Sequence, residues 1–383
     1  MTPAARVAAA IEVLDRWLTG VPAEKALTTW ARGARYAGSK DRAAVRDHVY
    51  DVLRRKGTCE AMGGPDGRGL MLGLARLQGL DPADLFTGLG HAPEPLSDAE
   101  LTRRVAAAPD PWRDIPDWLH DPLRDSLGDR AGDVVSAMGD RAPLYLRVNA
   151  RKASVNKAQD HLVTDGIITE TCDIPLALKV TDGPRRLRQS QAYLDGMVEV
   201  QDLSVQMACA AVDWPVSGRV LDYCAGGGGK ALAIAAVSDA QVFVHDAFPA
   251  RMADIPARAA RAGVTLTTAA RPEAHAPYDL VLCDVPCSGS GTWRRDPEAK
   301  WRLTPDRLQD LTRLQREIIK QTQSLIAPGG RLVYMTCSLL QAENEAVVDA
   351  ALTSPGWQRG QQRRFLPPAA SDGFFLAELQ RIA

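Results

Sequence analysis

The chain has 383 residues, of which 45% are hydrophobic, 24% are charged and 5% are aromatic. That length predicts two or three folded domains, and the composition excludes collagen-like, disulfide-scaffold and wholly disordered proteins. The 46 basic and 47 acidic side chains leave a net charge of −1, which taken over the whole chain argues against a nucleic-acid-binding protein.

Signals for membranes, secretion and metals are missing from the sequence. No uninterrupted apolar run reaches the ~18–20 residues needed to cross a bilayer. The start of the chain has the charges of Glu12 and Asp15 where a secretory signal would have its apolar core, so we expect a cytoplasmic protein with no membrane contact. The seven cysteines are odd in number and form no paired Cys-x-x-Cys motifs, so we expect neither a disulfide framework nor a bound metal.

Residues 1–56 have the apolar spacing of amphipathic helices. Within them, residues 31–56 carry eight Lys/Arg against three Asp, a net charge of +5. Residues 57–140 carry seven Arg against fifteen Asp/Glu, a net charge of −8. The charge is therefore segregated along the chain, and binding to phosphates responds to the local field rather than to the total.

Residues 143–200 have a different hydrophobic pattern from the N-terminal helices. Short alternating runs at Leu144–Val148, Leu176–Val180 and Met197–Val200 predict strands, and Val155–Asp165 predicts a helix among them. We expect a small α+β module of the RRM-like kind.

From residue 217 onward, strands and helices alternate with the spacing of a parallel sheet. The predicted strands are Arg219–Tyr223, Gln241–His245, Val264–Thr268, Asp279–Cys283 and Arg331–Met335. A helix is predicted between the last two, with Thr304 as its cap, Pro305 at its first position, and Gly329 and Gly330 at its end.

A glycine-rich turn follows the first of these strands. Four glycines let the backbone turn tightly and let a ligand approach main-chain N–H groups at a helix start. Asp246 follows Asp222 by 24 residues, at the end of the next strand, where a carboxylate can take the two ribose hydroxyls of an adenosine. A phosphate-binding P-loop would need Ser or Thr after Lys230, and the sequence has Ala231. A nucleotide-like cofactor is therefore favoured over a P-loop or a plain flexible turn.

Two cysteines lie just past the ends of two neighbouring strands. Asp284 and Cys287 follow the fourth predicted strand, and Cys337 follows the fifth. In open α/β sheets, ligands bind outside the carboxyl ends of the strands. Cys283 lies inside an apolar strand, so a packing role explains it well. A packing role explains Cys287 and Cys337 less well, because both lie at junctions between a strand and a loop. The residues alone leave open which thiol would act as a nucleophile.

Several motifs in order resemble the Sun/NOP (RsmB-type) family of S-adenosylmethionine-dependent RNA cytosine-5 methyltransferases. They are Asp222-Tyr-Cys-Ala-Gly-Gly-Gly-Gly-Lys230, Asp284-Val-Pro-Cys-Ser-Gly-Ser-Gly-Thr-Trp-Arg-Arg-Asp-Pro-Glu298, Thr336-Cys-Ser338, Glu343-Asn-Glu345, Val200-Gln-Asp-Leu-Ser-Val-Gln206 and Asp372-Gly-Phe-Phe-Leu376. The resemblance covers about residues 140–383, and residues 1–56 are more weakly similar to a NusB-like domain.

The resemblance implies a role for each site residue. Cys337 would be the nucleophile, Asp284 would contact N3 of the base, and Cys287 would assist release of the covalent product. Asp246 would bind the cofactor ribose and Asp284 would also line the cofactor site. The backbone of the glycine loop would bind the methionine part of S-adenosylmethionine through Cys224, Ala225, Gly226, Gly227, Gly228, Gly229 and Lys230.

The sequence departs from the family pattern in two places. Gly226, Gly227 and Ala231 stand where the family loop has an alanine, a proline and a threonine. After the third strand, Thr267-Thr-Ala-Ala-Arg271 stands where the family has an acid that contacts adenine. These departures put the rigidity of the loop and the adenine contact in question.

Basic and aromatic residues alternate after the Cys287 loop. Residues 293–316 carry seven Lys/Arg against four acids, a net charge of +3. We expect Arg294 and Arg295 to bind RNA phosphates, whereas Trp293 and Trp301 could equally stack on bases or pack inward. His245 is expected to pack or cap rather than to act in catalysis.

Together these features predict three domains. They are a helical NusB-like RNA-binding domain over 1–138, an RRM-like α+β module over 139–200, and a Rossmann-type α/β methyltransferase domain over 201–383. We expect a monomer that methylates C5 of a cytosine in RNA, with 16S ribosomal RNA as the first candidate substrate. The alternatives are the same chemistry on transfer RNA, or a non-catalytic RNA-binding factor in ribosome assembly.

Overall fold

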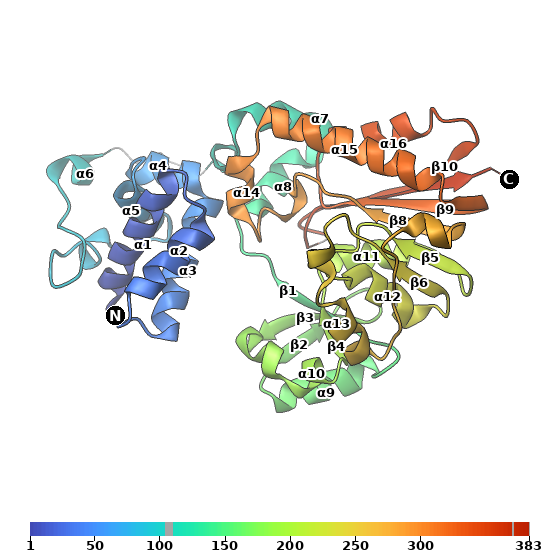
Figure 1. Ribbon diagram of the computed structural model, residues 1–383. Helices are drawn as coiled ribbons and strands as arrows, with labels where there is room; N and C mark the ends of the chain where they lie inside the picture. Colours follow the sequence, from blue (N-terminus) through green and yellow to red (C-terminus); the bar gives the residue numbers. More distant parts are fainter. Residues whose placement is uncertain (104–109, 370, 383) are drawn as a thin grey trace. The chain divides into compact units, whose positions relative to one another are not determined.

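The computed structural model describes residues 1–103, 110–369 and 371–382. The chain divides into two compact units (Figure 1). The helical unit comprises Met1–Arg124, Gly128–Arg141 and Trp293–Arg302. The sheet unit comprises Asp125–Leu127, Ala142–Thr292 and Leu303–Ala383.

Five consecutive helices form the first half of the helical unit. They are α1 (Pro3–Leu18), α2 (Ala23–Gly33), α3 (Ser39–Arg54), α4 (Lys56–Gly63) and α5 (Gly67–Leu77). Thr2 caps α1 by accepting a hydrogen bond from the Ala5 amide. Their apolar faces meet in one core in which Leu14, Val49, Leu53 and Leu70 are fully buried, which confirms the helices expected over residues 1–56.

A helix from much later in the chain completes the helical unit. Residues 82–103 and 110–138 contain α6 (Asp98–Thr102), α7 (His120–Leu127) and α8 (Ala131–Met138), and only Asp125–Leu127 of α7 belong to the sheet unit. The late helix is α14 (Pro297–Arg302), and it packs on α3. Lys300 Nζ donates to the Arg54 carbonyl at 2.7 Å and Trp301 Nε1 donates to the Leu53 carbonyl at 2.8 Å. The carbonyl groups in the last turn of a helix have no hydrogen-bond donor within the helix. The side chains of α14 supply these donors for α3.

The sheet unit begins with a four-stranded antiparallel sheet. Its strands are β1 (Leu144–Val148), β2 (Ile168–Thr171), β3 (Ala177–Asp182) and β4 (Val198–Val200), in the order β2-β3-β1-β4. Helices α9 (Val155–Thr164) and α10 (Gln191–Leu194) complete the module. The sequence patterns predicted three of these strands but not β2, because most of its side chains are exposed and polar.

A seven-stranded sheet forms the rest of the sheet unit, in the order β10-β11-β9-β8-β5-β6-β7. Its strands are β5 (Arg219–Asp222), β6 (Gln241–Val244), β7 (Thr267–Thr268), β8 (Tyr278–Asp284), β9 (Ile326–Thr336), β10 (Trp357–Phe365) and β11 (Phe374–Arg381). Strands β5 to β9 pair in parallel, whereas β11 is antiparallel to β9 and β10. The strand order reverses between β5 and β8, which is the topological switch point where α/β sheets bind ligands.

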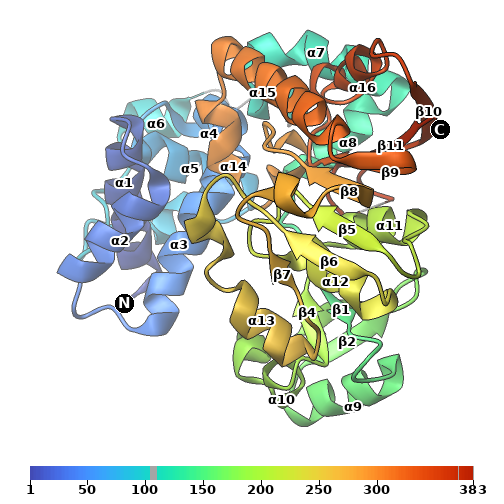
Figure 2. The same ribbon diagram turned by 45° about the vertical axis from the view of Figure 1, so that its right-hand side comes forward.

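Helices cover both faces of this sheet (Figure 2). One face packs against α11 (Leu203–Ala211), α12 (Gly229–Val237) and α13 (Ile255–Ala262). The other packs against α15 (Pro305–Gln323) and α16 (Glu345–Ala351). This arrangement confirms the Rossmann-type α/β sheet, the antiparallel α+β module and the helical N-terminal region expected from the sequence.

The expected end of helix α15 is wrong. Thr304 does cap the helix, accepting a hydrogen bond from the Arg307 amide, and Pro305 does occupy its first position. The helix ends at Gln323, however, and Gly329 and Gly330 lie inside β9. Gly329 has φ +74°, so a glycine-rich turn signal here marks a bend within a strand rather than a helix stop.

No helix among the described residues is both long and apolar enough to cross a membrane.

Candidate active site

The glycine loop connects β5 to α12 at the switch point. Gly226 and Gly228 have φ values of +50° and +79°, a backbone region that L side chains rarely adopt. A side chain at Gly227 would also meet Arg258, since its Cβ would lie 2.9 Å from Nη1. The path of this loop therefore favours glycine at Gly226 and Gly228.

Asp222, the last residue of β5, is a buried carboxyl group with an unused oxygen. It is 1% exposed, and its Oδ1 has no hydrogen-bond partner. Burial raises the pKa of Asp222 to about 7, although the charge of Lys230 opposes the shift. A buried acceptor without a partner is costly, and at the start of a glycine loop it is available to a ligand's donor.

Lys230 and Asp284 bridge the ends of α12 and β8. Lys230 Nζ donates to Asp284 Oδ2 at 2.5 Å and lies 5.4 Å from the centroid of the Phe374 ring. Burial by itself would lower the pKa of Lys230, but the charge and hydrogen bond of Asp284 raise it above its usual value. Lys230 therefore keeps its positive charge beside the cysteine loops.

Asp246 lies two residues past β6 and faces the glycine loop. Its Oδ2 accepts a hydrogen bond from the Gly226 amide at 2.9 Å, and its Oδ1 accepts one from the Phe248 amide at 2.9 Å. Arg251 forms an ion pair with it at 3.3 Å. Asp246 is thus placed at the loop as expected, and Arg251 is a partner that the sequence patterns did not indicate.

The two cysteines predicted to act together are in direct contact. Cys287 Sγ and Cys337 Sγ are 3.3 Å apart, and both side chains are half-buried. The hydrogen bond with Cys337 and burial raise the pKa of the Cys287 thiol well above its usual value. Cys283, in contrast, is fully buried within β8 and contacts Thr322, which confirms packing as its role.

One cavity of about 410 Å³ brings the cofactor loop and the thiols together. Its lining includes the glycine loop, Arg251, Asp222, Asp284, Cys287 and Cys337, together with Gln201 from the segment after β4. Almost all the residues expected to bind cofactor or to act in catalysis therefore meet in one place. Asp246, which is buried directly behind the loop, reaches the site through Gly226 and Arg251.

The small antiparallel sheet supports the glycine loop, which sequence reasoning missed. Arg258 on α13 donates to the Gly227 carbonyl and forms an ion pair with Glu199 of β4 at 3.3 Å. Arg261 pairs with the same carboxylate at 2.8 Å. Glu199 of the small sheet therefore holds Arg258, and Arg258 in turn holds the glycine loop through the Gly227 carbonyl.

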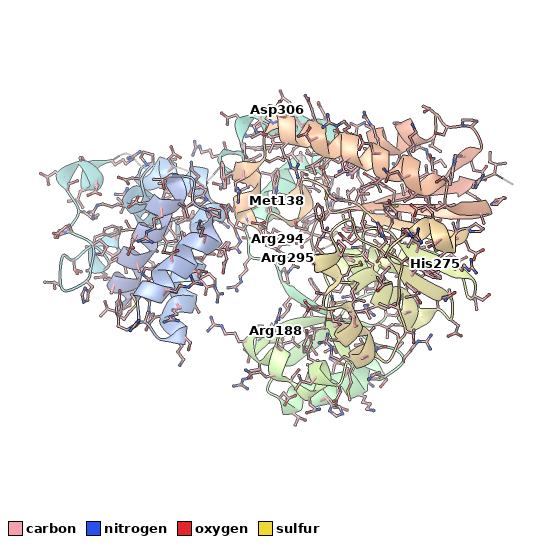
Figure 3. All side chains as sticks on the ribbon, in the orientation of Figure 1. Met138, Arg188, His275, Arg294, Arg295 and Asp306 are labelled. Atoms are coloured by element: carbon pink, nitrogen blue, oxygen red, sulfur yellow. The ribbon has the colours of Figure 1, made fainter. Side chains whose placement is uncertain are left out.

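Arg294 and Arg295 belong to the helical unit, and Figure 3 labels both. Arg294 is 8% exposed and donates to the carbonyls of Asp140 and Arg141. Arg295 is exposed. Burial of Arg294 gives it a packing role within its unit, so the predicted phosphate contact is better suited to Arg295.

The aromatic and histidine predictions have simple outcomes. Trp293 is 1% exposed, and Trp301 is half-buried with its indole N–H bonded to Leu53, so both pack inward. His245 contacts the Ala269 carbonyl through Nδ1 at 3.0 Å and lies against Tyr223. The expected packing of His245 is confirmed.

Among the described residues, no group of three or more His, Cys, Asp or Glu side chains could hold a metal ion.

The fold and cavity define a Rossmann-type methyltransferase. The family model "16S rRNA methyltransferase RsmB/F" matches residues 214–380, and a model of the ferredoxin-like domain of the same family matches residues 115–184.

The curated relatives agree with the family models. The chain is 30% identical to ribosomal RNA small subunit methyltransferase B of Xylella fastidiosa strain 9a5c over 89% of this chain and 92% of that protein. It is also 30% identical to the Pasteurella multocida protein of the same name, of which it spans 66%, and 32% identical to that of Klebsiella pneumoniae, of which it spans 65%. The chain therefore belongs to the RsmB family of ribosomal RNA small subunit methyltransferases.

Solved structures share the fold. The crystal structure of the protein PH0851 matches with a TM-score of 0.74 at 23% identity, over 100% of this chain and 99% of that chain. A methyltransferase homologue from Pyrococcus horikoshii matches with a TM-score of 0.60 at 25% identity, over 68% of this chain and 94% of that chain.

The residues of this cavity suit S-adenosylmethionine, the cofactor of the family. The unused oxygen of Asp222 can accept from a ligand's ammonium group, and the glycine loop presents main-chain amides at the start of α12. Asp246 holds the loop itself through Gly226. The third strand, β7, consists of Thr267 and Thr268 and is followed by Ala269. No acid therefore stands directly after this strand, where the family has one that contacts adenine.

Proposed function

We propose that this chain transfers a methyl group from S-adenosylmethionine to C5 of a cytosine in RNA, with 16S ribosomal RNA as the substrate. The observation that supports this most is the single cavity in which a cofactor-type glycine loop faces two thiols 3.3 Å apart. Binding of a nucleotide alone would require neither thiol. The names of the curated relatives favour ribosomal RNA over other RNAs.

A thiol is needed because C5 of cytosine is a poor nucleophile. Addition of a thiolate at C6 forms the S–C6 bond and moves the C5=C6 electron pair to C5, which can then attack an electrophilic methyl carbon. Loss of the C5 proton to a base restores C5=C6 while the C6–S bond breaks and the thiolate leaves. S-adenosylmethionine supplies the methyl group.

We assign the nucleophile to Cys337. This assignment follows the resemblance to the family, and it places the nucleophile 3.3 Å from Cys287 Sγ, whose thiol has a raised pKa because of the hydrogen bond with Cys337 and burial. Cys287 then serves in release of the product. Asp284 contacts N3 of the base, and the positive charge of Lys230, which is hydrogen-bonded to Asp284, stabilises the negative charge that builds up in the ring.

The rest of the chain serves binding. We propose that the glycine loop and Asp246 hold the cofactor, and that Arg295 and the basic residues of 31–56 contact RNA phosphates. The three domains, 1–138, 139–200 and 201–383, are proposed as a NusB-like RNA-binding part, an RRM-like part and the methyltransferase. We propose that the chain acts as a monomer in the cytoplasm.

Bisulfite sequencing tests the substrate. RNA from a strain lacking the gene is compared with RNA from the same strain carrying either the wild-type gene or Cys337→Ala. We expect one cytosine in 16S ribosomal RNA that resists bisulfite only with the wild-type gene. Resistance appearing in a transfer RNA instead would move the substrate to that class, and no difference in any RNA would reject the proposed reaction.

A further inference from the structure

Both cysteine loops are held by one buried carboxyl group that lies outside the cavity. Glu343 is 0% exposed, although it follows β9 in a short turn between two loops. Its Oε1 accepts from the Ser288 amide at 2.8 Å and from Gln315 Nε2 at 3.0 Å. Its Oε2 accepts from the hydroxyls of Ser288 and Ser338, each at 2.5 Å. Each carboxyl oxygen therefore has two donors.

Three of the four donors come from the residues directly after the two thiols. Ser288 follows Cys287, and Ser338 follows Cys337. Gln315 on α15 also donates to the carbonyl of Pro286, at 2.9 Å, so the Cys287 loop is fixed on both sides of the cysteine. One side chain thus connects the end of β8, the end of β9 and α15.

The turn that carries Glu343 is itself fixed. Tyr334 of β9 donates its hydroxyl to the Glu343 carbonyl at 2.6 Å, and Asn344 accepts from Thr336 at 2.6 Å and donates to the Ser338 carbonyl at 2.9 Å. The two loops share one backbone bond at this point, from the Gly291 amide to the Cys337 carbonyl at 2.9 Å. The buried acceptor with four donors adds a second connection between them, next to both cysteines.

We infer that Glu343 is a positioning residue that sets the distance between the Cys287 and Cys337 thiols. It touches neither sulfur, and it holds the loops through the serines beside them, while its charge adds to the raised pKa of the Cys287 thiol. A displacement of ~1 Å in a reacting pair can cost on the order of 100-fold in rate, so the reaction of two thiols with each other reports the separation directly. The importance of this distance for methyl transfer rests on the proposed function, but the distance itself can be measured without RNA.

The experiment measures formation of the Cys287–Cys337 disulfide in the full chain with oxidised glutathione. One thiolate attacks glutathione disulfide and releases one glutathione thiolate, and the second thiolate attacks the mixed disulfide and releases the other. The two protons of the protein thiols pass to the two glutathione thiolates. Peptide mass spectrometry follows the cross-link over time. The variants are Glu343→Ala and Glu343→Gln, with thermal unfolding to check that each is folded.

Glu345→Gln is the matched control. Glu345 lies two residues further on, at the start of α16, and pairs with Arg364 of β10 at 2.7 Å. Among the described residues, no hydrogen bond joins the Glu345 side chain to Ser288 or Ser338.

We expect rapid cross-linking in the wild type and in Glu345→Gln, about tenfold slower cross-linking in Glu343→Ala, and an intermediate rate in Glu343→Gln, which keeps one accepting oxygen. A folded Glu343→Ala that cross-links at the wild-type rate would overturn the inference, as would a wild type that does not cross-link. If the cross-linking differs as expected while the wild type methylates no RNA, the positioning role stands and the proposed function fails.

Discussion

At the residue scale, the two thiols have different parts in the proposed reaction. We predict that Cys337→Ala abolishes methyl transfer, because no thiolate then reaches C6. We predict that Cys287→Ala accumulates a protein–RNA adduct resistant to SDS, because addition proceeds and elimination is slowed. Denaturing gels with labelled RNA distinguish the two. Normal turnover by Cys337→Ala would show that the nucleophile has been assigned to the wrong sulfur.

Asp222 carries a prediction about stability. Its folded pKa of about 7 lies above the unfolded value of 3.8, so the folded state favours the protonated form. The cost to stability grows as pH rises from about 4 and is complete above about 7. We expect Asp222→Asn to raise the free energy of unfolding by about 1–2 kcal/mol at pH 8 and by little at pH 4, while it weakens cofactor binding.

Urea unfolding at the two pH values measures this effect. Asp160→Asn, an exposed aspartate on α9, is the control and should change neither value. An unfolding free energy that rises equally at pH 4 and pH 8 in Asp222→Asn would show that the carboxyl group is not protonated on folding.

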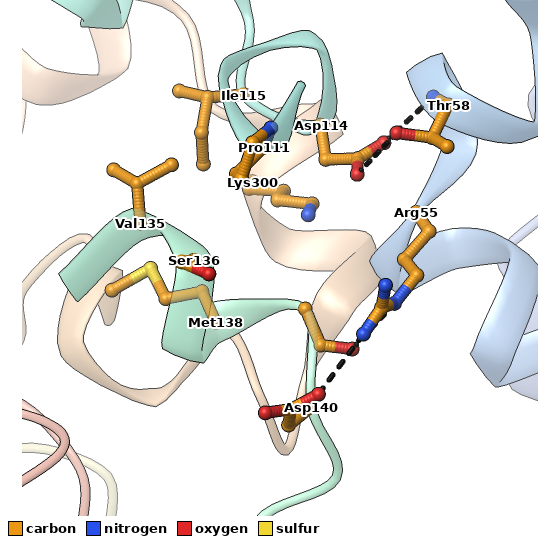
Figure 4. Close-up of a pocket in the computed structure, with 11 residues that line it drawn as sticks. Arg55, Thr58, Pro111, Asp114, Ile115, Val135, Ser136, Met138, Asp140 and Lys300 are labelled. Carbon is orange, nitrogen blue, oxygen red and sulfur yellow. Dashed lines mark hydrogen bonds and ion pairs between the residues drawn. The ribbon is translucent and has the colours of Figure 1, made fainter. Parts of the chain in front are cut away.

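At the scale of elements, α14 carries a buried lysine into the helical unit. Lys300 is 1% exposed and lines a cavity of about 240 Å³ with Arg55, Thr58 and Asp114 (Figure 4). Burial lowers the pKa of Lys300 to about 7, although the charge of Asp114 opposes the shift. The folded state therefore holds fewer protons than the unfolded chain between about pH 7 and 10.5.

That difference makes the contribution of Lys300 to stability increase with pH across this window, and its penalty is fully present below about pH 7. We predict that Lys300→Met is more stable than the wild type at pH 6.5 and that the gain is smaller at pH 9. Lys320→Met, at an exposed position on α15, serves as the control. Urea unfolding at both pH values tests the sign, and a gain that grows with pH would contradict it.

Sequence patterns predicted elements where one face is buried and failed where burial is slight. Strands β1, β5, β6 and β8 are apolar and were found close to their bounds. Strand β10 was missed because its sequence, Trp-Gln-Arg-Gly-Gln-Gln-Arg-Arg-Phe, is that of an exposed edge. The positions of Asp284, Cys287 and Cys337 followed from strand ends, whereas Glu343 and Arg258 act through long-range contacts that no local pattern encodes.

At the scale of the whole molecule, the net charge of −1 conceals local patches. Arg32, Arg35, Lys40 and Arg46 are all exposed in the segment 31–56, whose net charge is +5. If RNA phosphates bind there, log K falls with log salt by ~0.7 for each phosphate neutralised on a single strand. We predict that Arg35→Gln with Lys40→Gln lowers this slope by about 1.4. Arg130→Gln, in the acidic segment, should leave it unchanged, and an unaltered slope in the double variant would place RNA elsewhere.

The central claim is methyl transfer to C5 of cytosine, and one measurement tests it most directly. Purified chain is incubated with unmodified 16S ribosomal RNA and S-adenosylmethionine that carries a trideuterated methyl group, and the RNA is digested to nucleosides for mass spectrometry. We predict trideuterated 5-methylcytidine with the wild type and none with Cys337→Ala. Label in any other nucleoside, or label at cytidine that persists in Cys337→Ala, would contradict the account.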